Sequence, residues 1–121
     1  MNAHTHTSRL RAGMVGVGMI FEETYWPFFQ QVHSQPLYRR EHGPVEVQLM
    51  GMVSRTGSRA AGYVRQAVTA GMAPIANCIG VNGMSELLSR DVHAVCIATP
   101  DDRHFEAARL ALSLGRHVLV E

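Results

Sequence analysis

The sequence has few charged residues and no long apolar run, and both absences narrow the class of protein. Charged residues make up 17% of the 121 residues, and the net charge is +1 with neutral histidines. The arginines are scattered, so the sequence predicts no nucleic-acid partner. No apolar run approaches the roughly 20 residues of a membrane helix, and residues 1–11 lack the apolar core of a signal peptide. We therefore expect a soluble, cytoplasmic protein without a membrane partner.

Cysteine is also scarce. Cys78 and Cys96 lie far apart without Cys-x-x-Cys spacing, which predicts buried free thiols. The histidines are dispersed except for His4-Thr5-His6. We assign this cluster to a disordered tail over residues 1–10 rather than to a metal site, and predict no metal.

Strand-like and helix-like segments alternate along residues 11–121, which is typical of one α/β domain. The sequence predicts a doubly wound parallel sheet that ends after its fifth strand, and a loop over residues 34–44. The predicted strands are 12–15, 45–53, 75–81, 93–98 and 117–120. The first predicted helix begins near residue 19, and three further helices cover residues 58–70, 85–89 and 103–114.

Gly16-Val17-Gly18 follows the first predicted strand and precedes the first predicted helix. In a dinucleotide-binding fold, glycines at this turn let the backbone approach a pyrophosphate, and the helix N-terminus offers unpaired N–H groups. Phe21 stands where the fingerprint has a third small residue. Phe21 could displace part of the ligand site or fill the core, and we favour core filling.

Two later segments, residues 91–104 and 111–121, carry a more specific signal. The first reads Asp-Val-His-Ala-Val-Cys-Ile-Ala-Thr-Pro-Asp-Asp-Arg-His, and the second reads Ala-Leu-Ser-Leu-Gly-Arg-His-Val-Leu-Val-Glu. Together they closely resemble the N-terminal domain of the Gfo/Idh/MocA family, named for glucose-fructose oxidoreductase and inositol dehydrogenase. The resemblance covers residues from about 11 to 121, and it implies a Rossmann domain that binds NAD(P).

The resemblance also implies a set of cofactor-binding residues. The pyrophosphate would lie against the turn and helix start formed by Gly16, Val17, Gly18, Met19 and Ile20. The nicotinamide ribose would lie near Thr99, Pro100, Asp101 and His104, and Glu121 matches the glutamate that precedes the family's catalytic lysine. For His104, a helix residue that faces water is an equal alternative. The lysine and the family's substrate domain are absent from this sequence, so no catalytic residue is assigned.

Ser54 and Arg55 at the end of the second predicted strand bear on the choice of cofactor. NAD-specific members have an acidic residue there, which binds the ribose hydroxyls. A hydroxyl beside a guanidinium can instead bind a 2′-phosphate, so we expect NADP rather than NAD. The alternative is that both residues form a solvated turn.

The sequence therefore predicts the NAD(P)-binding domain of an oxidoreductase that acts on sugars, cyclitols or related alcohols. We expect the chain to be inactive alone, and to self-associate or to bind a partner that supplies the missing half. Two alternatives stay open: a non-catalytic NAD(P)-binding regulatory or assembly module, and a partial reading frame.

Overall fold

The computed structural model describes residues 8–99 and 101–120, without the side chains of residues 101–105. Its strands are β1 (Ser8–Val15), β2 (Leu37–Arg39), β3 (Gly43–Ser54), β4 (Ala76–Ile79), β5 (Ala94–Ile97) and β6 (His117–Val120). Its helices are α1 (Trp26–Ser34), α2 (Ser58–Thr69), α3 (Gly83–Leu88) and α4 (Asp101–Ser113), with a π-helical turn at Phe21–Tyr25 and a 3-10 turn at Gly80–Asn82.

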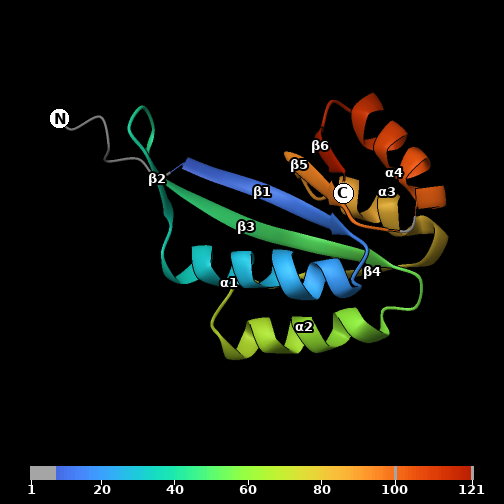
Figure 1. Ribbon diagram of the computed structural model, residues 1–121, viewed down its shortest axis with the longest axis horizontal. Coiled ribbons are helices and arrows are strands. Elements are labelled where there is room, and N and C mark those ends of the chain that lie inside the picture. The colour runs from blue at the N-terminus through green and yellow to red at the C-terminus, as the bar shows by residue number, and fades with distance from the viewer. Residues whose placement is uncertain (1–7, 100, 121) are drawn as a thin grey trace.

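The six strands form one sheet in the order β2-β3-β1-β5-β6, and β4 pairs with the carboxyl half of β3. All pairings are parallel except that of β2 with β3. After β4 the chain crosses back to the other side of β1, where it adds β5 and β6 (Figure 1). This crossover confirms the predicted doubly wound α/β class.

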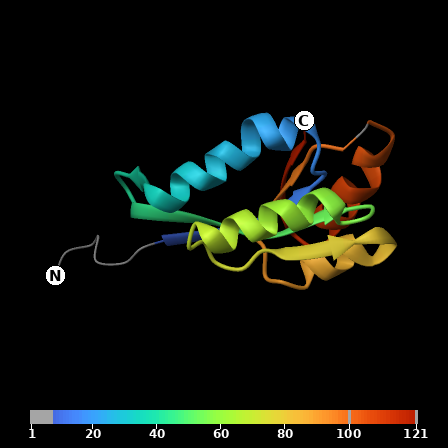
Figure 2. The same cartoon turned by 90° about the horizontal axis from the view of Figure 1, so that it is seen from below.

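Helices cover both faces of the sheet. Helices α1 and α2 lie on one face, while α3 and α4 lie on the other (Figures 1 and 2). Each face has its own apolar core, centred on Met14, Phe21 and Met52 under α1 and α2, and on Leu87, Val95 and Ile97 under α3 and α4. Within the described residues, none of the helices combines the length and apolarity that spanning a membrane would require.

Phe21 lies at the start of the π-helical turn and is fully buried. Its ring centroid is 4.8 Å from that of Tyr63 on α2 and 5.9 Å from that of Trp26 on α1. The backbone N–H of Trp26 donates to the Phe21 carbonyl, and Pro27 lies in the first turn of α1, where a proline is tolerated. Phe21 therefore packs between the two helices, which confirms the core-filling interpretation.

Two segments differ from the sequence-based expectations. Residues 37–39, inside the predicted loop, form β2, an edge strand that pairs with β3 in a hairpin. All three β2 residues are exposed, so no apolar alternation marked the strand. Strand β1 begins at Ser8, so residues 8–10 of the predicted tail pair with β3 instead. The rest of that tail, residues 1–7, lies outside the described residues.

Both cysteines are free thiols, as predicted, and Cys78 is fully buried while Cys96 is partly buried. Burial, with a further contribution from nearby Glu86, raises the pKa of the Cys78 thiol to about 11. Burial also raises the pKa of Cys96. Both thiols are therefore protonated at neutral pH, and Cys78 contributes to the core as a small apolar residue.

Candidate functional site

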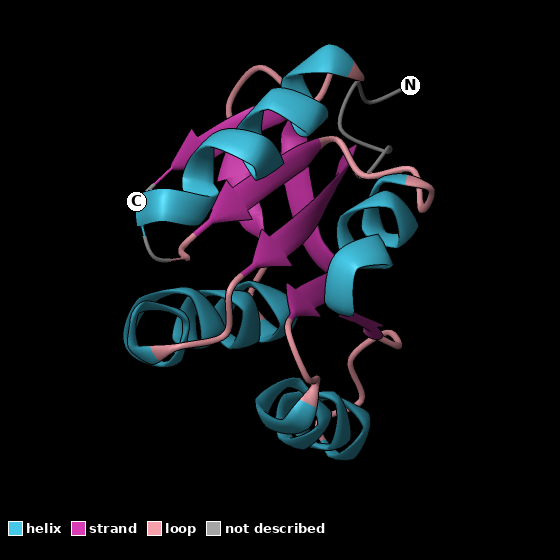
Figure 3. Cartoon of the chain, turned by 90° about the vertical axis from the view of Figure 1, so that its right-hand side faces the viewer, coloured by secondary structure: helices cyan, strands magenta, loops and turns pink. Residues whose placement is uncertain are grey.

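A cavity of about 580 Å³ lies at the carboxyl ends of β1, β3 and β5. Figure 3 looks onto this edge of the sheet, toward which the parallel strands point. The cavity is lined by Val15, Gly16, Val17, Gly18, Val53, Ser54, Arg55, Thr56, Ser58, Arg59, Gly80, Ala98 and Thr99. In open α/β sheets, ligands bind at this edge, where the chain reverses its winding direction.

Gly16 forms the floor of the cavity. Its φ is +97°, and a Cβ added there would lie 2.4 Å from the carbonyl oxygen of Ala98. The Gly16 N–H donates to the Val53 carbonyl over 2.9 Å, so this residue joins β1 to the end of β3. Only glycine meets both the backbone and the steric requirement at this position.

Gly18 differs from Gly16 because a Cβ there would meet no atom within 4 Å. Space beside the Gly18 backbone is therefore open to the cavity. The Gly18 carbonyl accepts from Glu22, so the helix starts within this turn. The N–H groups of a first helical turn lack intrahelical acceptors, and they favour anionic groups.

The loop between β3 and α2 forms one wall. The Ser54 Oγ accepts a hydrogen bond from the Gly57 N–H over 3.1 Å, and Thr56 Oγ1 donates to Ser58 Oγ over 3.2 Å. Arg55 and Arg59 are exposed and line the same cavity. No carboxylate lies among the described residues that line it, so this wall carries only positive charge and hydroxyl groups.

Thr99, the second residue after β5, also lines the cavity. Its Oγ1 is buried and has no hydrogen-bond partner within the described part of the chain. Buried hydroxyl groups are normally paired, so an unpaired one that lines a cavity suggests that a bound molecule completes the hydrogen bond.

The profile of the GFO_IDH_MocA family, described as an oxidoreductase family with an NAD-binding Rossmann fold, matches residues 10–121. The chain belongs to this family. Among solved structures, it is similar to a Gfo/Idh/MocA oxidoreductase from Vibrio cholerae (TM-score 0.62, 22% identity), over 92% of this chain and 29% of that one. Such identity shows the shared fold.

UDP-N-acetylglucosamine 3-dehydrogenase GnnA from Acidithiobacillus ferrooxidans is also similar, with a TM-score of 0.57 and 25% identity over 93% of this chain and 29% of that chain. A dehydrogenase from Chromobacterium violaceum matches with a TM-score of 0.62 and 22% identity, over 93% of this chain and 28% of that chain. The chain thus spans less than a third of the length of these structures. A search of curated proteins finds no significant match.

The structure brings six of the residues predicted for the cofactor site of this Gfo/Idh/MocA domain together around the cavity: Gly16, Val17, Gly18, Ser54, Arg55 and Thr99. Met19 and Ile20 are exposed and are not among the lining residues. Pro100 and Glu121 lie outside the described residues, as do the side chains of Asp101 and His104.

Sequence reasoning missed Thr56, Ser58 and Arg59, which also line the cavity. Ser58 and Arg59 occupy the first turn of α2, and this turn faces the cavity because it directly follows β3. The predicted helix start at residue 58 was the available signal. Burial and nearby Glu22 raise the pKa of Tyr63 above its usual value, while Arg59 lowers it in part.

The residues present fit a dinucleotide. Open space at Gly18 admits a pyrophosphate, the unpaired Thr99 Oγ1 offers a hydrogen bond, and two guanidinium groups suit phosphate. In contrast, the described residues contain no group of three or more His, Cys, Asp or Glu side chains that could hold a metal ion. The cavity is therefore chemically suited to an anionic nucleotide.

Proposed function

We propose that this chain binds NAD(P) as the cofactor domain of an oxidoreductase acting on sugars, cyclitols or related alcohols, in the cytoplasm. The observation that carries the proposal is the cavity between the Gly16–Gly18 turn and Thr99, at the carboxyl edge of a Rossmann sheet. Its similarity to GnnA, named as a UDP-N-acetylglucosamine 3-dehydrogenase, supports a sugar-type substrate.

In this proposal the turn of residues 16–20 wraps the pyrophosphate through the backbone N–H groups of residues 17–20, since the Gly16 N–H already donates to Val53. Met19 and Ile20 do not line the cavity, but they lie in the first helical turn, where the N–H groups lack intrahelical acceptors. Thr99 orients the nicotinamide ribose, together with Pro100, Asp101, His104 and Glu121. The bound cofactor would supply hydride transfer, while these residues bind and orient it.

The proposal favours NADP over NAD. Ser54 stands at the position of the NAD-specific acidic residue, and its side chain helps to order the loop through Gly57. Arg55 and Arg59 approach the same wall from a loop and from a helix. Two guanidinium groups without a lining carboxylate favour a 2′-phosphate, through charge-assisted hydrogen bonds.

We further propose that the chain alone does not turn over substrate. The described lining residues include no histidine, cysteine, aspartate, glutamate or lysine that could act as a general acid or base. The same observation favours the second candidate, a non-catalytic NAD(P)-binding regulatory or assembly module. Steady NADPH formation by the purified chain with a sugar or cyclitol would contradict both the proposed inactivity of the chain alone and the non-catalytic module.

Self-association, or binding to a partner that supplies a substrate site, also belongs to this proposal. Strand β6 is an edge strand in the described sheet, and its Leu119 and Val120 are about half exposed. Sedimentation at several protein concentrations measures self-association, and a constant monomer mass would contradict the proposed self-association.

Calorimetric titration with NADPH and NADH tests the cofactor proposal. We expect both cofactors to bind, and NADPH to bind more tightly. The Gly18→Ala substitution should weaken the binding of each by about tenfold, because the added methyl group occupies space needed by the pyrophosphate. Gly62→Ala is the matched control, since the nearest atom to a Cβ there is 3.9 Å away, on Arg65. If neither cofactor binds the wild-type protein, the proposed function is wrong.

A further inference from the structure

Asn77 lies on β4, next to the loop that carries Ser54 and Arg55, and it does not line the cavity. It pairs in register with Met52 of β3 and is partly buried. Its Nδ2 donates a hydrogen bond to the carbonyl oxygen of Gly57 over 3.0 Å. This bond joins strand β4 to the last residue of the loop before α2, across 20 residues of sequence.

Gly57 is the point at which the loop turns into α2. Its φ is +77°, and a Cβ there would lie 2.6 Å from Ile79 and 3.0 Å from Asn77. Its N–H donates to Ser54 Oγ, while its carbonyl accepts from Asn77 and from the Ala61 N–H. Both polar groups of Gly57 are therefore fixed, and Asn77 supplies the bond that comes from outside the loop and helix.

The other polar atom of the Asn77 side chain, Oδ1, is buried and has no partner within the described part of the chain. A buried acceptor without a partner is unfavourable, and an apolar side chain of similar size would avoid that cost. The amide thus stabilises one specific contact, the one to Gly57, while it leaves another group unpaired.

We propose that Asn77 is a positioning residue that sets the 54–58 loop at the distance from the Gly16–Gly18 turn that a 2′-phosphorylated adenosine requires. This inference rests on the proposed function. Asn77 acts through Gly57 on Arg55 and on Arg59 in the first turn of α2, without touching the cofactor. Its predicted effect is on the selectivity between NADPH and NADH.

Asn77→Leu tests the inference, because leucine has a similar size and removes both the donor and the unpaired Oδ1. We expect the variant to fold, and its affinity for NADPH to fall about fivefold, the loss expected from one hydrogen bond, while that for NADH changes less than about twofold. Asn82→Leu is the matched control, since Asn82 is exposed and is not a lining residue. A general loss of stability would lower the affinities for NADPH and NADH by the same factor.

A second measurement uses the wild-type protein, so it does not depend on the variant folding. In an NMR titration with adenosine 2′,5′-bisphosphate, we expect the Asn77 side-chain amide and the Gly57 N–H resonances to shift, and 5′-AMP to shift them less. Equal shifts with the two ligands, or an unchanged NADPH to NADH ratio in Asn77→Leu, would overturn the inference alone. A wild-type protein without NADPH preference would overturn the proposed cofactor choice, and this inference with it.

Discussion

The arginines Arg9 and Arg11 at the amino edge of the sheet have different surroundings from Arg55 and Arg59 at the carboxyl edge. At the amino edge, Arg9 pairs with Glu46 at 3.3 Å, and the Arg11 guanidinium lies 3.4 Å from both His93 and Asp91. At the carboxyl edge, Arg55 and Arg59 share a cavity without a lining carboxylate, and Thr99 Oγ1 is unpaired among the described residues. Polar groups that satisfy one another stabilise a fold, whereas those left open are available to a ligand.

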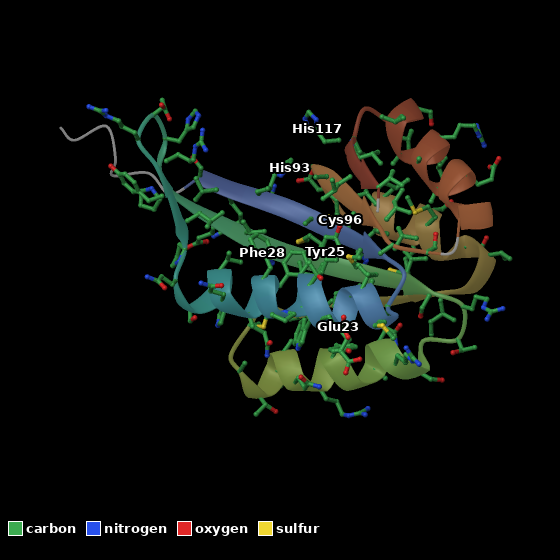
Figure 4. The ribbon with its side chains drawn as sticks, in the orientation of Figure 1. Glu23, Tyr25, Phe28, His93, Cys96 and His117 are labelled. Atoms are coloured by element: carbon green, nitrogen blue, oxygen red, sulfur yellow. The ribbon has the colours of Figure 1, made fainter. Side chains whose placement is uncertain are left out.

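Figure 4 shows the amino edge of β5 and β6, where His93 and His117 lie near each other. The His93 Nδ1 accepts a hydrogen bond from the backbone N–H of Arg11 over 2.9 Å, and the backbone N–H of His93 donates to the Arg11 carbonyl over 2.8 Å. A second cavity, of about 370 Å³, also lies toward this end, but its arginine, Arg9, is already paired with Glu46. These contacts give His93, Arg11 and Arg9 structural roles.

The largest expected effect concerns Gly16 at the carboxyl edge. Gly16→Ala would combine a positive φ with a Cβ 2.4 Å from the Ala98 carbonyl, so we expect the free energy of unfolding to fall by about 3 kcal/mol. Urea denaturation measures this change, with Gly62→Ala as the control. A loss below about 0.5 kcal/mol would show that the turn is less constrained than described.

The next effect separates the arginines of the two edges. Arg55→Ala and Arg59→Ala should each weaken NADPH binding by about tenfold, the loss of one charge-assisted hydrogen bond, and should leave unfolding nearly unchanged. Arg9→Ala, at the amino edge, should leave NADPH affinity unchanged. Calorimetry measures all three, and equal losses from the three variants would remove the distinction between the edges.

A smaller effect is expected at His93. His93→Leu keeps the side-chain volume but leaves the partly buried Arg11 N–H without its Nδ1 acceptor. We expect the free energy of unfolding to fall by about 1–2 kcal/mol, with NADPH affinity intact. Thermal unfolding and cofactor titration of the same preparation measure both quantities. Weaker NADPH binding with unchanged stability would mean that His93 belongs to the cofactor site.

The smallest effect is expected for the surface ion pair of Arg9 and Glu46, whose side chains are about half exposed. Glu46→Gln should destabilise the protein by about 0.5 kcal/mol or less at low salt, and the difference should vanish at high salt. Urea denaturation at two salt concentrations detects it. A larger, salt-independent loss would indicate that the amino edge depends on this pair.

Periodicity and family motifs predicted the elements that have an apolar face. The predicted strand 117–120 has the bounds of β6, and the helix predicted over 58–70 differs from α2 by one residue at its end. The exposed strand β2 was missed because residues 37–39 bury no side chain. The start of β1 at Ser8 was missed because Ser8–Leu10 are exposed and pair with β3 alone.

The candidate site was predictable where backbone or motif defined it, as at Gly16, Gly18 and Thr99. Arg59 could not be assigned from sequence, because its approach to the cavity depends on the direction in which α2 leaves β3. Asn77 was likewise hidden, since its contact with Gly57 spans 20 residues and arises from the pairing of β3 with β4. Tertiary contacts of this kind leave no local pattern.

We propose that NADPH binds at the carboxyl edge of the sheet and not at the amino edge. Hydrogen–deuterium exchange of the wild-type protein, with and without NADPH, tests it most directly. We expect slower exchange over residues 16–20, 54–59 and 98–99, with no change over residues 8–11 and 43–48. Protection confined to the amino edge, or none at saturating NADPH, would contradict it.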